Sequence, residues 1–134
     1  SFMETIKNNG KIISIIHRDE DWKKGLDFIT PDDHFVQVGT WWYDSGKKLD
    51  SHVHKDFSRT AQRTQESVYV RKGSMRVLLF TEEMEYLQDF ILKEGELAVF
   101  GYGGHGYEIL EDDTQIIESK NGPFAGVEQD KIKF

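Results

Sequence analysis

Cysteine is absent from this chain of 134 residues, and proline occurs only twice. Without cysteine the protein has no disulfide bond, no thiolate ligand for a metal ion and no thiol nucleophile. The absence fits a reducing compartment, so we expect a cytoplasmic protein. Twelve glycines against two prolines predict a chain with many tight turns.

Long apolar runs and an excess of basic residues are missing as well. No stretch approaches the roughly 18 apolar residues of a membrane helix, and no basic segment followed by an apolar one opens the chain, so we expect neither a membrane span nor secretion. The residues Ser1 and Phe2 ahead of Met3 have the form of a cloning remnant. The net charge of −7 opposes a phosphate backbone and argues against nucleic-acid binding.

What the chain does contain is typical of a globular protein. Apolar residues make up 37%, aromatic residues 13% and charged residues 31%. A chain of this length is large enough for one core and too small for two. Because no internal repeat and no linker stands out, we expect a single domain over residues 1–134.

Short runs of β-branched and aromatic residues, separated by turn residues, dominate the sequence. In the second half they recur about every ten residues, a spacing typical of an antiparallel sandwich or barrel. Residues 55–64 are polar and predict a loop, and residues 19–33 predict one helical turn or an irregular arm. We expect strands over residues 11–18, 35–43, 47–54, 66–70, 75–80, 86–92, 97–100, 107–110 and 114–119.

Two of the five histidines, His52 and His54, are separated by a single residue. In a strand, residues two apart lie on the same face about 7 Å from each other, so both imidazoles can converge on one ion. The same spacing also occurs in polar strands whose histidines are solvated or structural. The pair alone therefore does not decide between the two roles.

Two longer stretches resemble the paired motifs of the cupin family. The first runs from Gly46 through His52-x-His54 and Glu66 to Gly73, and the second runs from Gly95 through Gly101-x-Gly103 to His105. The resemblance covers residues 35–118, which would form the core under an N-terminal arm and a C-terminal tail. It implies an all-β fold, the cupin double-stranded β-helix or jelly-roll β-barrel, and a homodimer, since edge strands need cover.

The resemblance also implies a metal site inside the barrel. In cupins the histidines and glutamate of the first motif, with the histidine of the second, hold a divalent metal. Carried over residue by residue, the ligands are His52, His54, Glu66 and His105, a set that suits Fe, Mn, Ni, Zn or Cu. This chain departs from the family at three points. Eleven residues between His54 and Glu66 predict an inserted loop, Gly101 replaces a usual proline, and His105 comes one residue early.

Other polar residues near these motifs are candidates for ligand binding and catalysis. Arg63, in the inserted loop, could bind a phosphate or carboxylate through its planar guanidinium, although most charged loop residues only solvate the surface. Tyr107 shares the strand face of His105 and is a second ligand-binding candidate. Glu108 and Glu118 are both candidates for a general acid or base. If His105 faces inward, Glu108 on the same strand faces outward, so we prefer Glu118.

The nature of the ligand is indicated by three short segments. Residues 63–66 (RTQE), 103–110 (GGHGYEIL) and 116–126 (IIESKNGPFAG) are similar to small bacterial cupins of polysaccharide and sugar-nucleotide pathways. This similarity implies a small polar, carbohydrate-like ligand. The consecutive aromatic residues 41–43 could stack on a sugar ring, but neighbours in a strand face opposite ways, so we expect them in core or dimer packing.

The sequence leaves three functions open. The first is a metal-dependent enzyme that uses Lewis-acid or oxygen-activating chemistry on a small polar molecule. The second is a metal-free sugar-nucleotide isomerase or epimerase in which His54 or His105 removes a proton beside a carbonyl group. The third is a non-catalytic protein that only captures a ligand.

Overall fold

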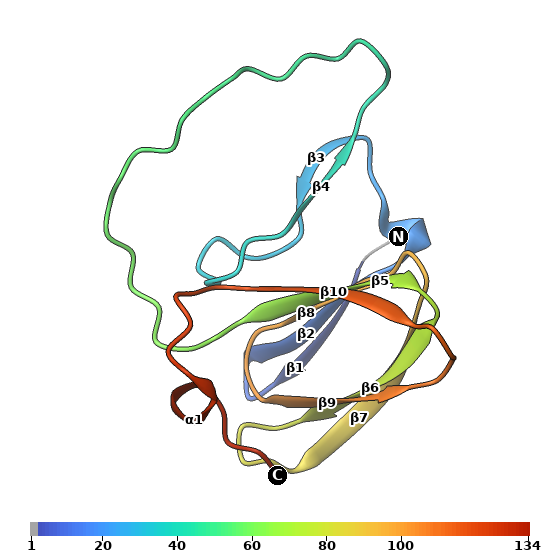
Figure 1. Cartoon of the computed structure of the whole chain (residues 1–134), viewed down its shortest axis with the longest axis vertical. Coiled ribbons are helices and arrows are strands. Elements are labelled where there is room, and N and C mark those ends of the chain that lie inside the picture. Colours follow the sequence, from blue (N-terminus) through green and yellow to red (C-terminus); the bar gives the residue numbers. More distant parts are fainter. Residues whose placement is uncertain (1–2) are drawn as a thin grey trace.

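Antiparallel strands form most of the regular structure in the computed structural model, which describes residues 3–134 (Figure 1). The protein is therefore all-β, as expected, while Ser1 and Phe2, the expected cloning remnant, lie outside the described residues. Within residues 3–134, helix is confined to the short turns η1 (Asp19–Asp21) and α1 (Val127–Asp130). The strands are β1 (Glu4–Asn8), β2 (Lys11–His17), β3 (Gly25–Phe28), β4 (Gly39–Trp42), β5 (Glu66–Lys72), β6 (Ser74–Phe80), β7 (Tyr86–Lys93), β8 (Leu97–Phe100), β9 (Gly104–Ile109) and β10 (Gln115–Lys120).

Two main sheets and one separate hairpin make up the architecture. The larger sheet has the strand order β1-β2-β8-β5-β10, the smaller one has the order β7-β6-β9, and β3 pairs with β4. From β5 onward the chain passes repeatedly between the two main sheets, which face each other in Figure 1. Within residues 3–134, no helix is long and apolar enough to cross a bilayer.

The main core fills the space between the two large sheets. Val68 and Val70 of β5 meet Val77 and Leu79 of β6, and Leu92 of β7 completes this group of almost fully buried side chains. Their alternation along each strand is the pattern of sheets with one face on a core. Burying a Val or Leu side chain contributes about 1.5–3 kcal/mol, so this cluster dominates the stability of the fold.

A second, smaller cluster covers the opposite face of the larger sheet. Ile15 of β2 and Val99 of β8 pack there against Ile29 and Val36. Val99 alternates with Ala98 and Phe100, which belong to the main core, so the two clusters lie on opposite faces of one sheet. The segment between β3 and β4 thus closes the outside of this sheet.

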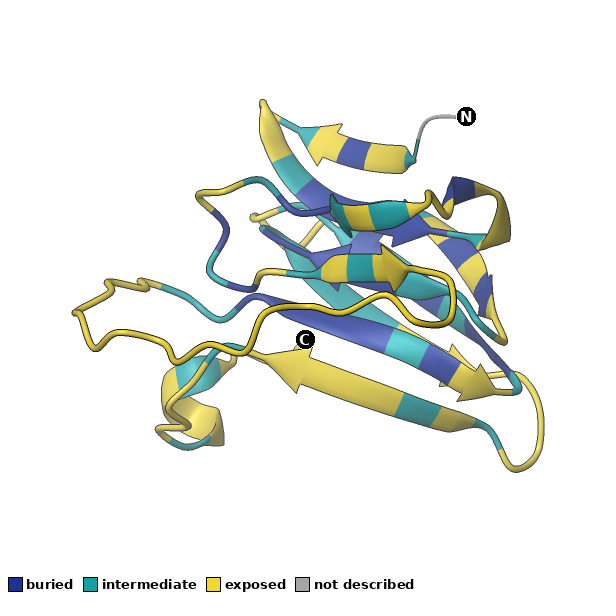
Figure 2. Ribbon diagram, turned by 90° about the horizontal axis from the view of Figure 1, so that it is seen from above, coloured by how far each residue is buried: buried dark blue, intermediate teal, exposed yellow. Residues whose placement is uncertain are grey.

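The expected strand over residues 47–54 is wrong. Residues 43–65 contain no helix or strand, and the chain makes a long excursion from the body there, exposed over nearly all of its length (Figures 1 and 2). Leu49 and Val53, the large apolar residues of the predicted strand, are both exposed. In a strand these two residues would share one face, but no described strand pairs with this segment, so that face meets no sheet.

Other boundaries also differ from expectation. The predicted strand 35–43 narrows to β4, and the arm predicted for residues 19–33 contains η1 followed by β3. The strand β1 was missed because ETIKN has one buried residue, Ile6. β1 lies at the edge of the larger sheet, where one side of the strand is unpaired, and its sequence has no run of apolar residues that would predict a strand.

Candidate functional site

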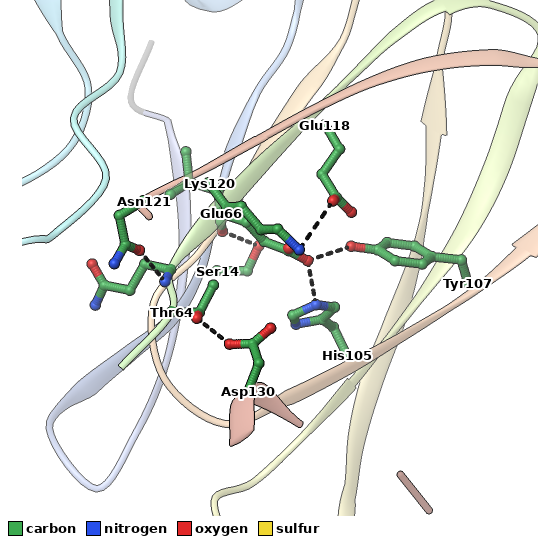
Figure 3. A network of polar contacts seen from close by, with 11 residues as sticks. Ser14, Thr64, Glu66, His105, Tyr107, Glu118, Lys120, Asn121 and Asp130 are labelled. Atoms are coloured by element: carbon green, nitrogen blue, oxygen red, sulfur yellow. Dashed lines mark hydrogen bonds and ion pairs between the residues drawn. The ribbon is translucent and has the colours of Figure 1, made fainter. Parts of the chain in front are cut away.

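An open cavity of about 800 Å³ lies beside the beginning of β5 and the first half of β9. The polar side chains at its wall come from segments far apart in the sequence, and Figure 3 shows several of them pointing toward one another. The sheets supply Glu66, His105, Tyr107 and Glu118, while the loop before β5 supplies Arg63. Five of the residues that the sequence predicts for the site therefore share one cavity.

The Glu66 carboxylate is the centre of this group. His105 Nε2 lies 2.6 Å from Glu66 Oε1, and the Tyr107 hydroxyl donates a hydrogen bond of 3.2 Å to the same oxygen (Figure 3). The side chain of Glu66 is only 8% exposed and that of His105 is 27% exposed. A buried carboxylate is thus satisfied by two donors, both of which line the open cavity.

Strand register explains why these side chains meet. Glu66 lies opposite Phe100 in the larger sheet, so both point to the same face. His105 comes from β9 in the facing sheet and stacks on the Phe100 ring, with centroids 4.3 Å apart and planes at 22°. Phe100 therefore holds the imidazole against the carboxylate, and Tyr107 lies two residues further along β9 on the same face.

Glycine is required at the entrance to β9. Gly103 has a φ of +76°, and a Cβ atom at this position would collide with the Phe80 carbonyl oxygen. Residues with a side chain rarely adopt this backbone conformation. The glycine-rich segment thus lets β9 approach β6 closely and sets the position of His105, which pairs with Leu79.

The contacts of Glu66 also control its ionisation. Burial raises the pKa of the Glu66 carboxyl, but the hydrogen bond and charge of His105, followed by Tyr107 and Lys120, outweigh burial, so the net pKa lies below its usual range. Burial, and then the negative charge of Glu66, raise the pKa of the Tyr107 hydroxyl far above its usual value. Near neutral pH the site therefore holds a carboxylate acceptor beside a protonated phenol.

Glu118 and Lys120 place a pair of opposite charges at the cavity. The Lys120 Nζ lies 3.7 Å from Glu118 Oε1, and Lys120 is opposite Glu66 in the pairing of β10 with β5. Glu118 is half-exposed at the wall, where it can meet a ligand. Glu108, expected to face outward, is exposed and pairs with Arg76 at 3.4 Å.

Arg63 lies at the rim rather than beside the Glu66 carboxylate. Its guanidinium stacks over the Tyr102 ring at 4.6 Å from the centroid and lies 3.8 Å from Glu82. Among the described residues, its Nε is buried without a hydrogen-bond partner. Tyr102 and Glu82 thus hold the Arg63 guanidinium in place.

The two loop histidines lie apart from this group. His52 and His54 are exposed in the segment between β4 and β5, and neither lines the cavity. Their ring centroids are 5.1 Å apart, and His52 Nδ1 lies 3.1 Å from the Asp50 carbonyl oxygen. The structure brings together two of the four predicted metal ligands, and over residues 3–134 no three histidine or acidic side chains cluster as an ion site would require.

Sequence reasoning missed the contribution of the C-terminal segment. The Thr64 hydroxyl donates a short hydrogen bond to Asp130 of α1, and residues 131–134 line the cavity. The Phe134 ring packs edge-on against Phe80, with centroids 4.9 Å apart. Lys131 and Lys133 add positive charge at this wall. The tail lacks strand periodicity, so nothing in its sequence pointed to the cavity.

Comparison with known proteins supplies no relative: no family model, curated protein or solved structure matches this chain. The chemistry of the site therefore rests on its own donor atoms. Ligand atoms on adjacent positions of one first-row metal ion lie about 3 Å apart, since each is about 2.0–2.2 Å from the ion. The 2.6 Å between His105 Nε2 and Glu66 Oε1 is a hydrogen-bonding distance, so an ion held by both atoms would replace this hydrogen bond; both donor types suit such ions.

Proposed function

We propose that this chain is a cupin-like protein that binds a divalent metal ion and a small polar ligand in the cavity around Glu66. The observation that carries the proposal is the contact between Glu66 and His105, which come from facing sheets and meet in a ligand-sized opening. The repeated passage of the chain between two antiparallel sheets supports the double-stranded β-helix. Ligand pockets of this volume are usual for small molecules.

The ligands that we propose for the metal are Glu66, His105, His52 and His54. His52 and His54 lie in the segment of residues 43–65, and a segment of this length without regular structure is typical of a functional loop. We propose that this loop folds toward the cavity when the ion binds and brings both histidines to His105.

The residues around the carboxylate suit a polar, carbohydrate-derived ligand. A bound metal would supply Lewis-acid polarisation of a ligand oxygen. Tyr107 would donate a hydrogen bond, because its hydroxyl stays protonated, and Glu118 would accept one or exchange a proton. Arg63 and Lys131 would attract an anionic group of the ligand at the rim.

A second candidate is a metal-free isomerase or epimerase. It is favoured by the arrangement in which one carboxylate oxygen accepts from both His105 and Tyr107. An ionised carboxylate orients an imidazole and stabilises its protonated form, so His105 would take a proton from a carbon beside a carbonyl group. Tyr107, as a neutral donor, would stabilise the resulting enolate oxygen.

Metal analysis of purified variants separates the two candidates. Wild-type protein should carry one equivalent of a first-row metal by plasma mass spectrometry, or take up one equivalent of Zn²⁺ in calorimetry. Glu66→Gln and the double variant His52→Ala/His54→Ala should lose it. The control Glu108→Gln, an exposed carboxylate on the same strand as His105, should keep it.

Two other outcomes are informative. Substoichiometric metal in all proteins, with isomerisation of sugar nucleotides that survives chelation and is lost in His105→Gln, would replace the metal proposal by the second candidate. Thermal stabilisation by sugar phosphates or nucleoside-diphosphate sugars with no turnover and no metal would leave only ligand capture.

A further inference from the structure

A second, smaller cavity lies on the outer face of the larger sheet, on the side away from β6, β7 and β9, where the hairpin of β3 and β4 stands over the sheet (Figure 1). Its volume is about 190 Å³, and among the described residues it shares none with the cavity around Glu66. Ile29 and Val38, which anchor the hairpin on the sheet, are part of its lining. We call this space the hairpin cavity.

Strand register forms the floor of the hairpin cavity from one row of side chains. His17 of β2 lies opposite Leu97 of β8, and Leu97 lies opposite Tyr69 of β5. Cross-strand partners share a face of the sheet, and here it is the face of the smaller core cluster, because Ile15 and Val99 lie two residues away from His17 and Leu97. All three residues of the row line the cavity. The floor therefore has one imidazole beside a leucine and a tyrosine.

The His17 imidazole is a buried polar group without a partner. The residue is only 2% exposed, and among the described residues its Nε2 makes no hydrogen bond. The Trp22 ring meets the imidazole in a T-shaped contact, with centroids 5.3 Å apart, and so holds its orientation. A buried polar atom that stays unpaired costs free energy. A ligand in the hairpin cavity that pairs with Nε2 would remove this cost.

The size and the walls of the hairpin cavity indicate what such a ligand would be. One water molecule takes up only about 30 Å³ of liquid and needs two to four polar partners, so water on Nε2 would leave most of the space between Ile29, Val38 and Leu97 unfilled. An apolar cavity of about 150 Å³ is large enough to bind benzene. The hairpin cavity therefore has room for one aromatic ring with one small polar substituent.

We propose that the hairpin cavity binds a monocyclic phenol, with the phenol hydroxyl on His17 Nε2. A hydroxyl group both donates and accepts hydrogen bonds, so it pairs with either neutral tautomer of the imidazole. Trp22 and Tyr69 supply aromatic contacts to the bound ring. Trp22 is 39% exposed, so the cavity reaches solvent beside it. This site is separate from the proposed metal site at Glu66.

A titration with phenol, followed by NMR of protein with ¹⁵N-labelled histidine and tryptophan, tests the proposal. A single-ring ligand has few atoms with which to bind, so we expect one site with a Kd of about 1 mM and titrate to about 10 mM. The Nε2 signal of His17 should move and saturate, while that of His105 in the other cavity stays fixed. Toluene has the same size without a hydroxyl group, so it should shift the indole signal of Trp22 and move the Nε2 signal much less.

Two variants separate the hydrogen bond from the space. His17→Phe keeps an aromatic ring against Trp22 and removes Nε2, so phenol should bind at least about tenfold more weakly because its hydroxyl is left unpaired, whereas toluene should bind as before. Leu97→Trp places a larger side chain on the floor and should exclude both compounds. The control Leu110→Trp changes an exposed leucine outside the cavity and should bind both as wild type does.

Circular dichroism of each variant checks that the fold is retained. A wild-type protein whose His17 signal does not respond to phenol would overturn the proposal, as would a response of His105 alone. A folded His17→Phe or Leu97→Trp protein with unchanged phenol affinity would overturn it as well. The titration is made with chelator present, so its result is independent of the metal analysis.

Discussion

Replacing Glu66 by glutamine tests the electrostatic centre of the site, because the substitution keeps the shape of the side chain and removes its charge. Hydrogen bonds to charged groups contribute about 1.5–3 kcal/mol and neutral ones about 0.5–1.5 kcal/mol. His105 is partly exposed, so solvent weakens its share of the interaction. We therefore expect Glu66→Gln to lower the free energy of unfolding by about 1 kcal/mol at pH 7, which corresponds to about 3 °C in Tm for a chain of this size.

The pH dependence of this difference in the free energy of unfolding is a sharper test. The pKa of Glu66 is lowered in the folded protein, so its carboxylate stabilises the fold above the ordinary value of 4.5, and this contribution is lost as pH falls through the folded pKa. Wild type and Glu66→Gln should therefore differ at pH 7 and converge as the pH falls below 4.5.

Urea unfolding followed by tryptophan fluorescence, with chelator present, measures both quantities. Glu108→Gln should change little at either pH, because its carboxylate is exposed and surface ion pairs contribute little. Equal stability of wild type and Glu66→Gln at pH 7, or a difference that persists unchanged in acid, would refute the reasoning.

Three further expectations follow from the packing around the site. Leu79→Ala should cost about 2–5 kcal/mol in urea unfolding, since Leu79 is fully buried between the sheets; a cost below 1 kcal/mol would contradict the assigned core. Gly103→Ala should destabilise more than Gly95→Ala, because both have positive φ but only Gly103 would also meet the Phe80 carbonyl; equal thermal shifts would count against this close approach. Tyr107→Phe should lose about 1 kcal/mol yet keep its metal, and loss of metal would show that the hydroxyl does more than donate to Glu66.

The sequence predicted the two sheets well where strands are bounded by turn glycines. Residues 75–80 and 97–100 carry apolar side chains at the spacing of a half-buried or buried strand, and the structure has β6 and β8 there. Gly73 and Gly95, both at positive φ, end the preceding strands. In these segments the residue preferences and the burial in the core both favour a strand, and for this reason the prediction is confirmed.

Prediction failed where local sequence and tertiary contacts differ. Residues 47–54 contain a plausible alternation, but a strand requires a partner, and pairing partners are not visible in the sequence itself. The aromatic residues 41–43 are a second example: we expected them in core or dimer packing, but all three are exposed and none belongs to either core cluster.

In the candidate site, too, some residues were predicted from the sequence and others were not. The resemblance to cupins singled out Glu66 and His105, and these two residues are in contact. Phe100, which holds His105 by stacking, and Asp130, which binds Thr64, were not foreseen, because ring stacking and long-range hydrogen bonds leave no pattern in a single sequence. Lys120 was missed for a simpler reason, namely that its importance comes from its register opposite Glu66.

The most direct test of the account is a Zn²⁺ titration of protein with ¹⁵N-labelled histidine, followed by NMR of the imidazole nitrogens. One ion shared by the cavity and the loop predicts that the signals of His52, His54 and His105 change together and saturate at one equivalent, while those of the buried His17 and His34 stay fixed. Changes confined to His52 and His54, with His105 unaffected at saturation, would contradict the account, because the ion would then be held by the loop alone.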